Sequence, residues 1–237
     1  NFGEFSDNKI DRVSYGENGV EYMPCKNSLL CDCTVVVDHT EMLCNSTEGT
    51  GKHHRWIVTI DGQNSTVSTT NYNRPKISTV IGMIDAHNDG GEPVTILGTD
   101  FGESQSKLES VTYGPSGTEF NALDCLLVSH FEIRCKTSPG LGDNLKWSIT
   151  VDKQTSDLSD VSTNYKTPSI VSLVEDSGET QGQTVHVING THLAVNVPGS
   201  YVEVLMDGEP IPLDGDEGSE FTKAVSGSYL TGRDGDM

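Results

Sequence analysis

The clearest pattern in the chain is a strict alternation of apolar and polar residues that occurs twice. In segment 146–152 every second residue from Trp147 is apolar, and segment 55–61 repeats this pattern from Trp56. Alternation with a period of two is typical of a half-buried antiparallel strand, whose apolar side chains share one face. Each segment is therefore predicted to be a strand that packs its tryptophan into a core.

The residues before each tryptophan are also repeated. A pair of cysteines precedes it, the second at the same interval, and a His-x-Glu motif comes just before that second cysteine. A shared interval across loops of different sequence indicates a duplicated structural unit. The residues are Cys33, His39, Glu41, Cys44 and Trp56 in the first copy, and Cys125, His130, Glu132, Cys135 and Trp147 in the second.

Two further landmarks define the repeat period. Tyr72 and Tyr165, and likewise Pro75 and Pro168, are 93 residues apart. We therefore expect three repeats with short, stiff linkers, since a proline at the first position of a strand leaves little slack. The predicted fold is all-β, with tandem immunoglobulin-like sandwiches, one complete and two partial. The expected boundaries are 1–74 (without its first strands), 75–167 (complete) and 168–237 (degenerate, without its last strands).

The two incomplete copies lead to an expectation about assembly. A sandwich without two of its strands has exposed sheet edges, and such edges pair readily with other chains. We expect that the chain belongs to a longer polypeptide, or that strands of another copy complete the end repeats in a head-to-tail assembly.

Composition and charge exclude several classes of protein. The formal net charge is −20, which argues against nucleic-acid binding, where lysine and arginine must replace counterions. No apolar run reaches the ~20 residues needed to span a bilayer. The segment that starts at Asn1 has neither the basic region nor the apolar core of a signal peptide. No nucleophile, phosphate-loop or dinucleotide motif is present, so neither catalysis nor a cofactor is expected.

The six cysteines predict disulfides and an oxidising compartment. We expect Cys33 to pair with Cys44 and Cys125 with Cys135, which leaves Cys25 for Cys31, although Cys25 with Cys33 is also sterically conceivable. A thiolate zinc site that includes His39 is the weaker alternative, because the second copy has no third ligand. Three glycosylation sequons agree with secretion to the cell surface or the extracellular space. They begin at Asn45, Asn64 and Asn189.

Two other patterns have residue types that bind metal ions. The His-x-Glu motifs lack the Cys-x-x-Cys pair of a zinc deaminase, so His39 and Glu41 are interpreted as sheet-surface residues. Acidic segments at 85–92 and 214–220 place oxygen ligands close together, partly like a calcium loop. A solvated loop is the default interpretation for both. The calcium candidates of the second segment are Asp214, Asp216 and Glu220.

Taken together, the motifs resemble the IPT/TIG domain, the immunoglobulin-like module of plexins, fibrocystin-type receptors and large protist surface proteins. The likeness covers the chain as three tandem copies and is most specific in the middle one. Its motifs there are Pro75-Lys-Ile77, Val94-Thr-Ile-Leu-Gly-Thr-Asp-Phe-Gly102, Val111-Thr-Tyr-Gly114, Cys125-Leu-Leu-Val-Ser-His-Phe-Glu-Ile-Arg-Cys135, Gly140-Leu-Gly142 and Trp147-Ser-Ile-Thr-Val151.

The resemblance implies a sandwich of about seven strands per copy and no catalysis. The expected function is a structural segment of a large extracellular repeat protein that builds or decorates a surface filament or coat, such as that of a cilium or flagellum. The alternative is an adhesion or receptor ectodomain that binds a protein or glycan. The expected partners are other copies or domains of the same protein, or such a ligand, with no nucleic acid.

Overall fold

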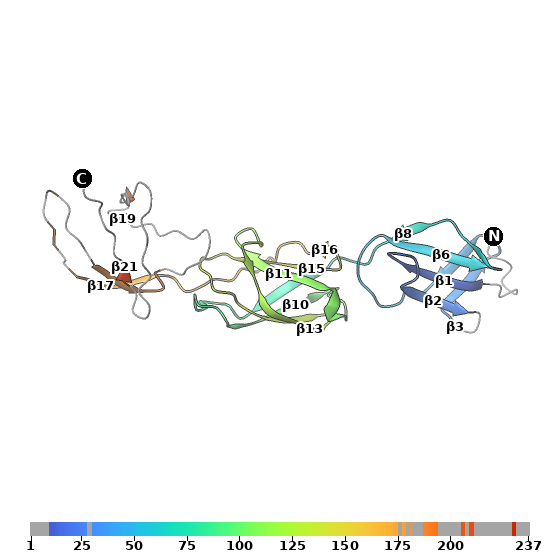
Figure 1. Ribbon diagram of the computed structural model, residues 1–237, viewed down its shortest axis with the longest axis horizontal. Coiled ribbons are helices and arrows are strands. Elements are labelled where there is room, and N and C mark those ends of the chain that lie inside the picture. Colours follow the sequence, from blue (N-terminus) through green and yellow to red (C-terminus); the bar gives the residue numbers. More distant parts are fainter. Residues whose placement is uncertain are drawn as a thin grey trace.

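The structure is a computed structural model that describes residues 10–27, 30–174, 177–178, 181 and 187–193, and short strands at 205–206, 209–210 and 229–230. In this part of the chain every element is a β-strand except the 3-10 helix η1 (Gln105–Lys107). Figure 1 shows the strands in three groups along the long axis of the molecule. No helix among the described residues is long and apolar enough to cross a membrane.

The middle group, here called the middle unit, is a sandwich of two four-stranded antiparallel sheets. One sheet has the order β13-β14-β10-β9 and the other β12-β11-β15-β16. The strands are β9 (Lys76–Ile81), β10 (Pro93–Thr99), β11 (Leu108–Gly114), β12 (Phe120–Asn121), β13 (Leu123–Ser129), β14 (Glu132–Lys136), β15 (Lys146–Val151) and β16 (Gln154–Thr155).

The alternating pattern of β15 produces the core of this unit. Trp147 and Ile149 are fully buried and Val151 nearly so, as the period of two predicts. Ser148 is buried as well, so the strand is covered on both faces at that position, which the pattern alone did not indicate. On the facing sheet, Ile96 of β10 is paired with Ile133 of β14, and both are fully buried.

The first group, here called the N-terminal unit, has one large sheet and one separate hairpin. The sheet has the order β3-β2-β1-β6-β7, with β8 also paired to β6, and the hairpin consists of β4 and β5. The strands are β1 (Ile10–Gly16), β2 (Tyr22–Asn27), β3 (Leu30–Cys31), β4 (Cys33–Val37), β5 (Glu41–Cys44), β6 (His54–Ile60), β7 (Gln63–Asn64) and β8 (Ser68–Thr70).

The N-terminal unit buries its tryptophan less completely than the middle unit does. Trp147 is fully buried, whereas Trp56 is only half-buried. In the middle unit the hairpin β13–β14 is extended by β10 and β9, but the described residues of the N-terminal unit provide no strands that extend β4–β5 in this way. The face that strands equivalent to β9 and β10 would cover in the N-terminal unit is therefore left open beside Trp56.

The third group has two small sheets, β17-β18-β21 and β19-β20, and β17 is exposed along its whole length. The strands are β17 (Ser169–Val174), β18 (Val187–Thr191), β19 (Leu205–Met206), β20 (Glu209–Pro210) and β21 (Tyr229–Leu230). The division at 74/75 and 167/168 stays a prediction.

Candidate functional site at the junction of two units

The N-terminal and middle units share an aromatic cluster with the same internal geometry. Tyr15 stacks on Trp56 with ring centroids 4.2 Å apart, and Tyr113 stacks on Trp147 at 4.4 Å. A third aromatic residue, Tyr72 in the first cluster, comes from the segment that leaves the unit. The hydroxyl of Tyr72 contacts that of Tyr15 and donates to the carbonyl of Thr47 at 2.5 Å.

The middle unit repeats this third contact. Tyr165 lies 2.5 Å from Tyr113 between hydroxyl oxygens, and it donates to the carbonyl of Ser138 at 2.6 Å. In each unit a tyrosine therefore ties the departing chain to the core. Burial, followed by the hydrogen bond to the neighbouring tyrosine, raises the pKa of Tyr72 and of Tyr165 well above the ordinary value.

A glutamate turn is also present in both units. The Glu119 carboxylate accepts hydrogen bonds from the backbone amides of Ser116 and Thr118, and Glu21 occupies the equivalent turn with Asn18 and Val20. Burial alone would raise the pKa of each carboxyl, but these hydrogen bonds lower it overall. The shared turn and the shared aromatic cluster indicate one structural plan in both units.

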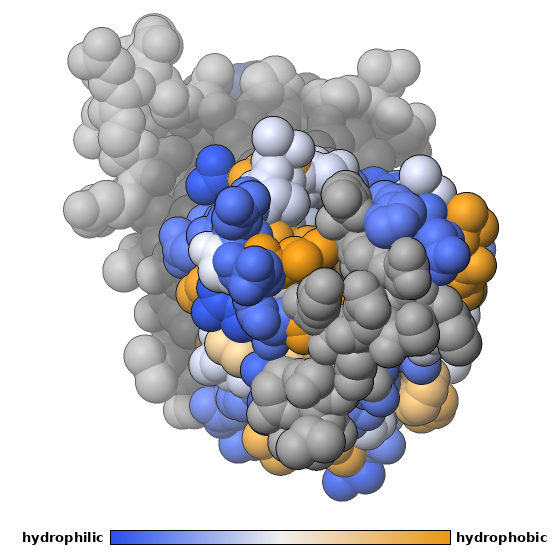
Figure 2. Space-filling view, turned by 90° about the vertical axis from the view of Figure 1, so that its right-hand side faces the viewer, coloured by the Kyte–Doolittle hydropathy of each residue, from blue (hydrophilic) through white to orange (hydrophobic). Residues whose placement is uncertain are grey.

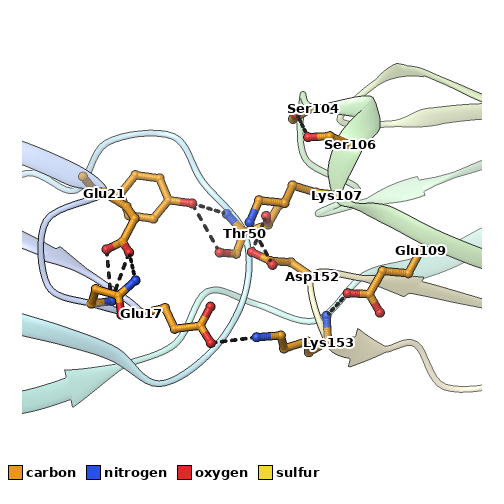
Figure 3. Close-up of polar contacts among 11 residues, drawn as sticks. Glu17, Glu21, Thr50, Ser104, Ser106, Lys107, Glu109, Asp152 and Lys153 are labelled. Atoms are coloured by element: carbon orange, nitrogen blue, oxygen red, sulfur yellow. Dashed lines mark hydrogen bonds and ion pairs between the residues drawn. The ribbon is translucent and has the colours of Figure 1, made fainter.

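The contact between the two units is centred on Asp152, which follows β15 (Figure 3). Its Oδ2 accepts a hydrogen bond at 3.1 Å from the Thr50 hydroxyl of the N-terminal unit. Its Oδ1 pairs with the Lys107 ammonium of the middle unit at 3.0 Å. The hydrogen bond to Asp152 raises the pKa of Lys107. The Asp152 side chain is only 15% exposed, so this contact is less screened by water than a surface ion pair.

Three more contacts cross the junction around Asp152. The Lys153 ammonium pairs with Glu17 at 2.7 Å, while its backbone amide donates to Glu109 (Figure 3). The Gln154 side chain donates to the carbonyl of Tyr72 at 3.1 Å. Arg74 pairs with Asp157 through two hydrogen bonds, at 2.8 and 2.9 Å. The last pair is exposed and contributes little stability by itself.

On the middle unit these contacts come from the single segment 152–157, and on the N-terminal unit from two loops and the departing segment. Such a set restrains rotation about the linker, because a hinge motion must break several contacts together. The sequence pattern predicted short linkers but did not indicate which residues make these contacts. Their positions follow from the packing of loops that are far apart in the chain.

The structure places the predicted cysteines as follows. Cys33 is bonded to Cys44 and Cys125 to Cys135, with Cα atoms 4.0 and 4.1 Å apart. Cys25 is also disulfide-bonded, and its backbone is paired with that of Cys31 in the β2–β3 register. No free cysteine is found in the described part of the chain.

The predicted glycosylation residues lie at the surface to different degrees. Asn45 and Asn64 are exposed, whereas Asn189 is half-buried, and its side chain donates to Ser172 at 3.2 Å. Glycosylation at all three residues stays a prediction.

The candidate metal residues separate into three cases. Asp214, Asp216 and Glu220 lie outside the described residues. His39 and Glu41 are exposed on the β4–β5 hairpin, as expected of sheet-surface residues. The described residues contain one group with metal-ligating geometry that sequence reasoning missed, formed by Glu48, Glu103 and His130. The His-x-Glu motif pointed to His130, but nothing in the sequence placed the two glutamates beside it.

An apolar groove lies on the open face of the N-terminal unit. It has a volume of about 380 Å³ and includes Val13, Met42, Trp56 and Val58 in its lining. Figure 2 looks onto the end of the molecule that carries this unit and shows hydrophobic residues gathered near the middle of that face.

The geometry of the middle unit agrees with a comparison with known families. The IPT/TIG domain model matches residues 84–165, which begin after β9, include strands β10 to β16 and end at Tyr165. The middle unit is an IPT/TIG domain. The recognition of this family from the sequence is thereby confirmed, and so is the all-β class of the fold. No curated protein matches the chain in sequence.

Solved structures show a partial likeness to the chain. The Plexin A4 full extracellular region is 22% identical, with a TM-score of 0.33, over 66% of this chain and 15% of that chain. SGBP-B from a xyloglucan utilization locus of Bacteroides uniformis is 16% identical, with a TM-score of 0.32, over 79% of this chain and 55% of that chain. The Escherichia coli adhesin FdeC is 10% identical, with a TM-score of 0.30, over 79% and 63%. The chain thus spans less than two thirds of each of these proteins.

Proposed function

We propose that the chain is a non-catalytic structural segment of a large extracellular protein, in which tandem TIG repeats build or decorate a cell-surface filament or coat. The observation that carries this proposal is the junction around Asp152. Several hydrogen bonds and ion pairs connect the two units there, which is what a stiff rod requires. A flexible tether would instead have a long polar linker with few contacts.

The extracellular location is part of this proposal. Disulfides persist in oxidising compartments and are rare in the cytosol. Asn45 and Asn64 are exposed, so a glycosylation enzyme could reach both sequons.

Electron microscopy of the native protein, extracted without detergent and then with it, tests this function. Filaments or a regular surface coat that bind antibodies against residues 75–167 would support it. Isolated rods on a membrane-embedded stalk would contradict it and favour a receptor.

The second candidate function is an adhesion or receptor ectodomain, and a surface feature of the middle unit favours it. Strand β13 is at the edge of its sheet and has Leu126 and Val128 exposed on its outer side, with Phe131 in the adjacent turn. Their exposed fractions are 56, 43 and 61%. An edge strand with exposed apolar residues is a common site for partner binding.

Binding of the recombinant chain to an array of defined glycans tests this candidate. Saturable binding that is lost in Phe131→Ser but kept in Ile84→Ser would support it, since Ile84 is exposed elsewhere on the same unit. Binding that is equal in both variants would contradict a role for the β13 edge.

A further inference from the structure

Glu48, Glu103 and His130 meet at the junction although they come from three distant segments. Glu48 lies in the loop between β5 and β6, Glu103 follows β10, and His130 is in the turn between β13 and β14. One ligand atom from each of them lies within 4.8 Å of the others. The first residue belongs to the N-terminal unit and the other two to the middle unit, so this cluster exists only when the two units are docked.

The loops that carry the two glutamates pack closely. A Cβ atom on Gly102 would lie 2.4 Å from the Thr50 methyl group, so only glycine fits beside this threonine. Gly102 also has a φ of +79°, a conformation that glycine adopts readily. Thr50 is itself held by its hydrogen bond to Asp152. Glu103 directly follows Gly102 and Glu48 lies two residues before Thr50, so the backbones of both glutamates are held close to these anchored residues.

The two carboxylates of this cluster have few partners in the described part of the chain. His130 Nε2 lies 3.5 Å from Glu103 Oε1, and no lysine or arginine of the described part of the chain forms an ion pair with Glu48 or Glu103. The neighbouring cation Lys107 is bound to Asp152 instead. Two carboxylates this close repel each other unless a cation lies between them.

The ligand types indicate which cation would bind. Calcium and magnesium prefer oxygen ligands alone, whereas zinc binds imidazole nitrogen together with carboxylate oxygen. Zinc ligands lie about 2.0–2.2 Å from the ion, which places two of them ~3.4 Å apart in a tetrahedral site. Small side-chain rotations would bring the three atoms to that separation. Water would supply the fourth ligand, since Glu103 is well exposed.

We propose that Glu48, Glu103 and His130 form a zinc site that links the N-terminal unit to the middle unit. The site would occur at this junction and not at the next one along the chain. Four residues after Cys135, where the first copy has Glu48, the second copy has Pro139, which has no ligand atom. Zinc would thus stiffen one defined position in the chain, a property that goes beyond the proposed structural function and does not depend on it.

Calorimetric titration of the tag-free, metal-stripped chain with zinc chloride tests the site. We expect one zinc ion per chain. Glu48→Gln, Glu103→Gln and His130→Gln should each weaken binding about tenfold or more, since even changes outside the ligand shell cost about that much. Two matched controls, His39→Gln from the other His-x-Glu motif and Glu132→Gln beside His130, should leave binding unchanged. Circular dichroism would verify that each variant is folded.

A second readout separates this site from zinc held by other histidines. Because both units supply ligands, zinc should raise the unfolding temperature and join the transitions of the two units, and Glu48→Gln should abolish this coupling. The proposal is overturned by an absence of zinc binding, by binding that all three variants retain, or by a chain that binds calcium but not zinc.

Discussion

At the scale of single residues, His54 is the clearest departure from the plan that the two units share. It stands two residues before Trp56, and Leu145 stands two residues before Trp147. His54 is 4% exposed, and neither of its ring nitrogens has a hydrogen-bond partner. Its ring lies edge-on to the rings of Tyr22 and Tyr72. A polar ring thus occupies a place that the middle unit fills with a buried leucine.

We predict that His54→Leu stabilises the N-terminal unit. The substitution removes two unsatisfied ring nitrogens, each of the kind that costs about 1–3 kcal/mol when buried, and it introduces the residue that the equivalent position already accommodates. Urea denaturation should show a gain in the free energy of unfolding of about 1–3 kcal/mol. The reciprocal change Leu145→His should destabilise the middle unit. A loss of stability in His54→Leu would mean that the imidazole has a favourable role within the ring cluster.

The two linker-proximal tyrosines predict how stability changes in alkaline solution. The pKa of a tyrosine in an unfolded chain is about 10, and those of Tyr72 and Tyr165 are raised in the folded state. The folded state therefore holds these protons more tightly. The resulting stability is fully present below pH ~10 and is lost as the pH rises through the folded pKa.

Absorbance of the tyrosinate form during an alkaline titration checks this prediction. A late-titrating component should be present in the native chain and should shrink in Tyr72→Phe and in Tyr165→Phe. In Tyr22→Phe it should persist. Ionisation of all tyrosines together, well before unfolding, would contradict the prediction that the folded state buries these two hydroxyls.

At the scale of elements, the two disulfide-linked hairpins have similar local structure but different surroundings. Cys33–Cys44 and Cys125–Cys135 close loops with sequence separations of 11 and 10 residues. Strand β14 is also paired with β10, whereas β4 and β5 pair only with each other in the described part of the sheet system. The disulfide therefore contributes a larger share of the stability of the first hairpin than of the second.

We predict that losing Cys33–Cys44 is more damaging than losing Cys125–Cys135. Each disulfide should contribute about 2–3 kcal/mol by reducing the chain entropy of the unfolded state, so this contribution is similar for the two bonds. The double serine variant at Cys125 and Cys135 should keep its β14 amides protected from hydrogen exchange, because β10 still pairs with them. The variant at Cys33 and Cys44 should lose protection across β4 and β5. Equal protection in both variants would show that the first hairpin is not destabilised by its lack of neighbouring strands.

At the scale of the whole molecule, the junction contacts determine whether the two units behave as one rigid body. Asp152 accepts bonds from both units, whereas Asp124 pairs with Lys136 at 2.9 Å within the middle unit. The first contact crosses the junction and is partly shielded from water. The second is exposed and local, so it serves as a matched control.

We predict that Asp152→Asn loosens the junction without unfolding either unit. Loss of a charged hydrogen-bond acceptor should reduce the coupling between the units by about 1.5–3 kcal/mol. Small-angle X-ray scattering should show a broader distribution of overall lengths, and the thermal transitions of the two units should move further apart. Asp124→Asn should leave both measurements unchanged. An unaltered length distribution in Asp152→Asn would show that other contacts hold the junction.

The sequence by itself determined the strands, the duplicated unit and the two disulfides between Cys33 and Cys44 and between Cys125 and Cys135. These features depend on local alternation and on intervals between landmarks, which are written directly in the residue order. The family followed from the same landmarks. The burial of Trp147 was predictable because its strand alternates in a complete sandwich.

Only the tertiary structure decided the incomplete burial of Trp56, the unsatisfied ring of His54 and the contacts of Asp152. Burial depends on which strands cover a face, and the first hairpin lacks the neighbours that the second one has. The cluster of Glu48, Glu103 and His130 likewise depends on how two units dock. Such docking is governed by loop shapes and by charges far apart in the chain, which no periodic pattern encodes.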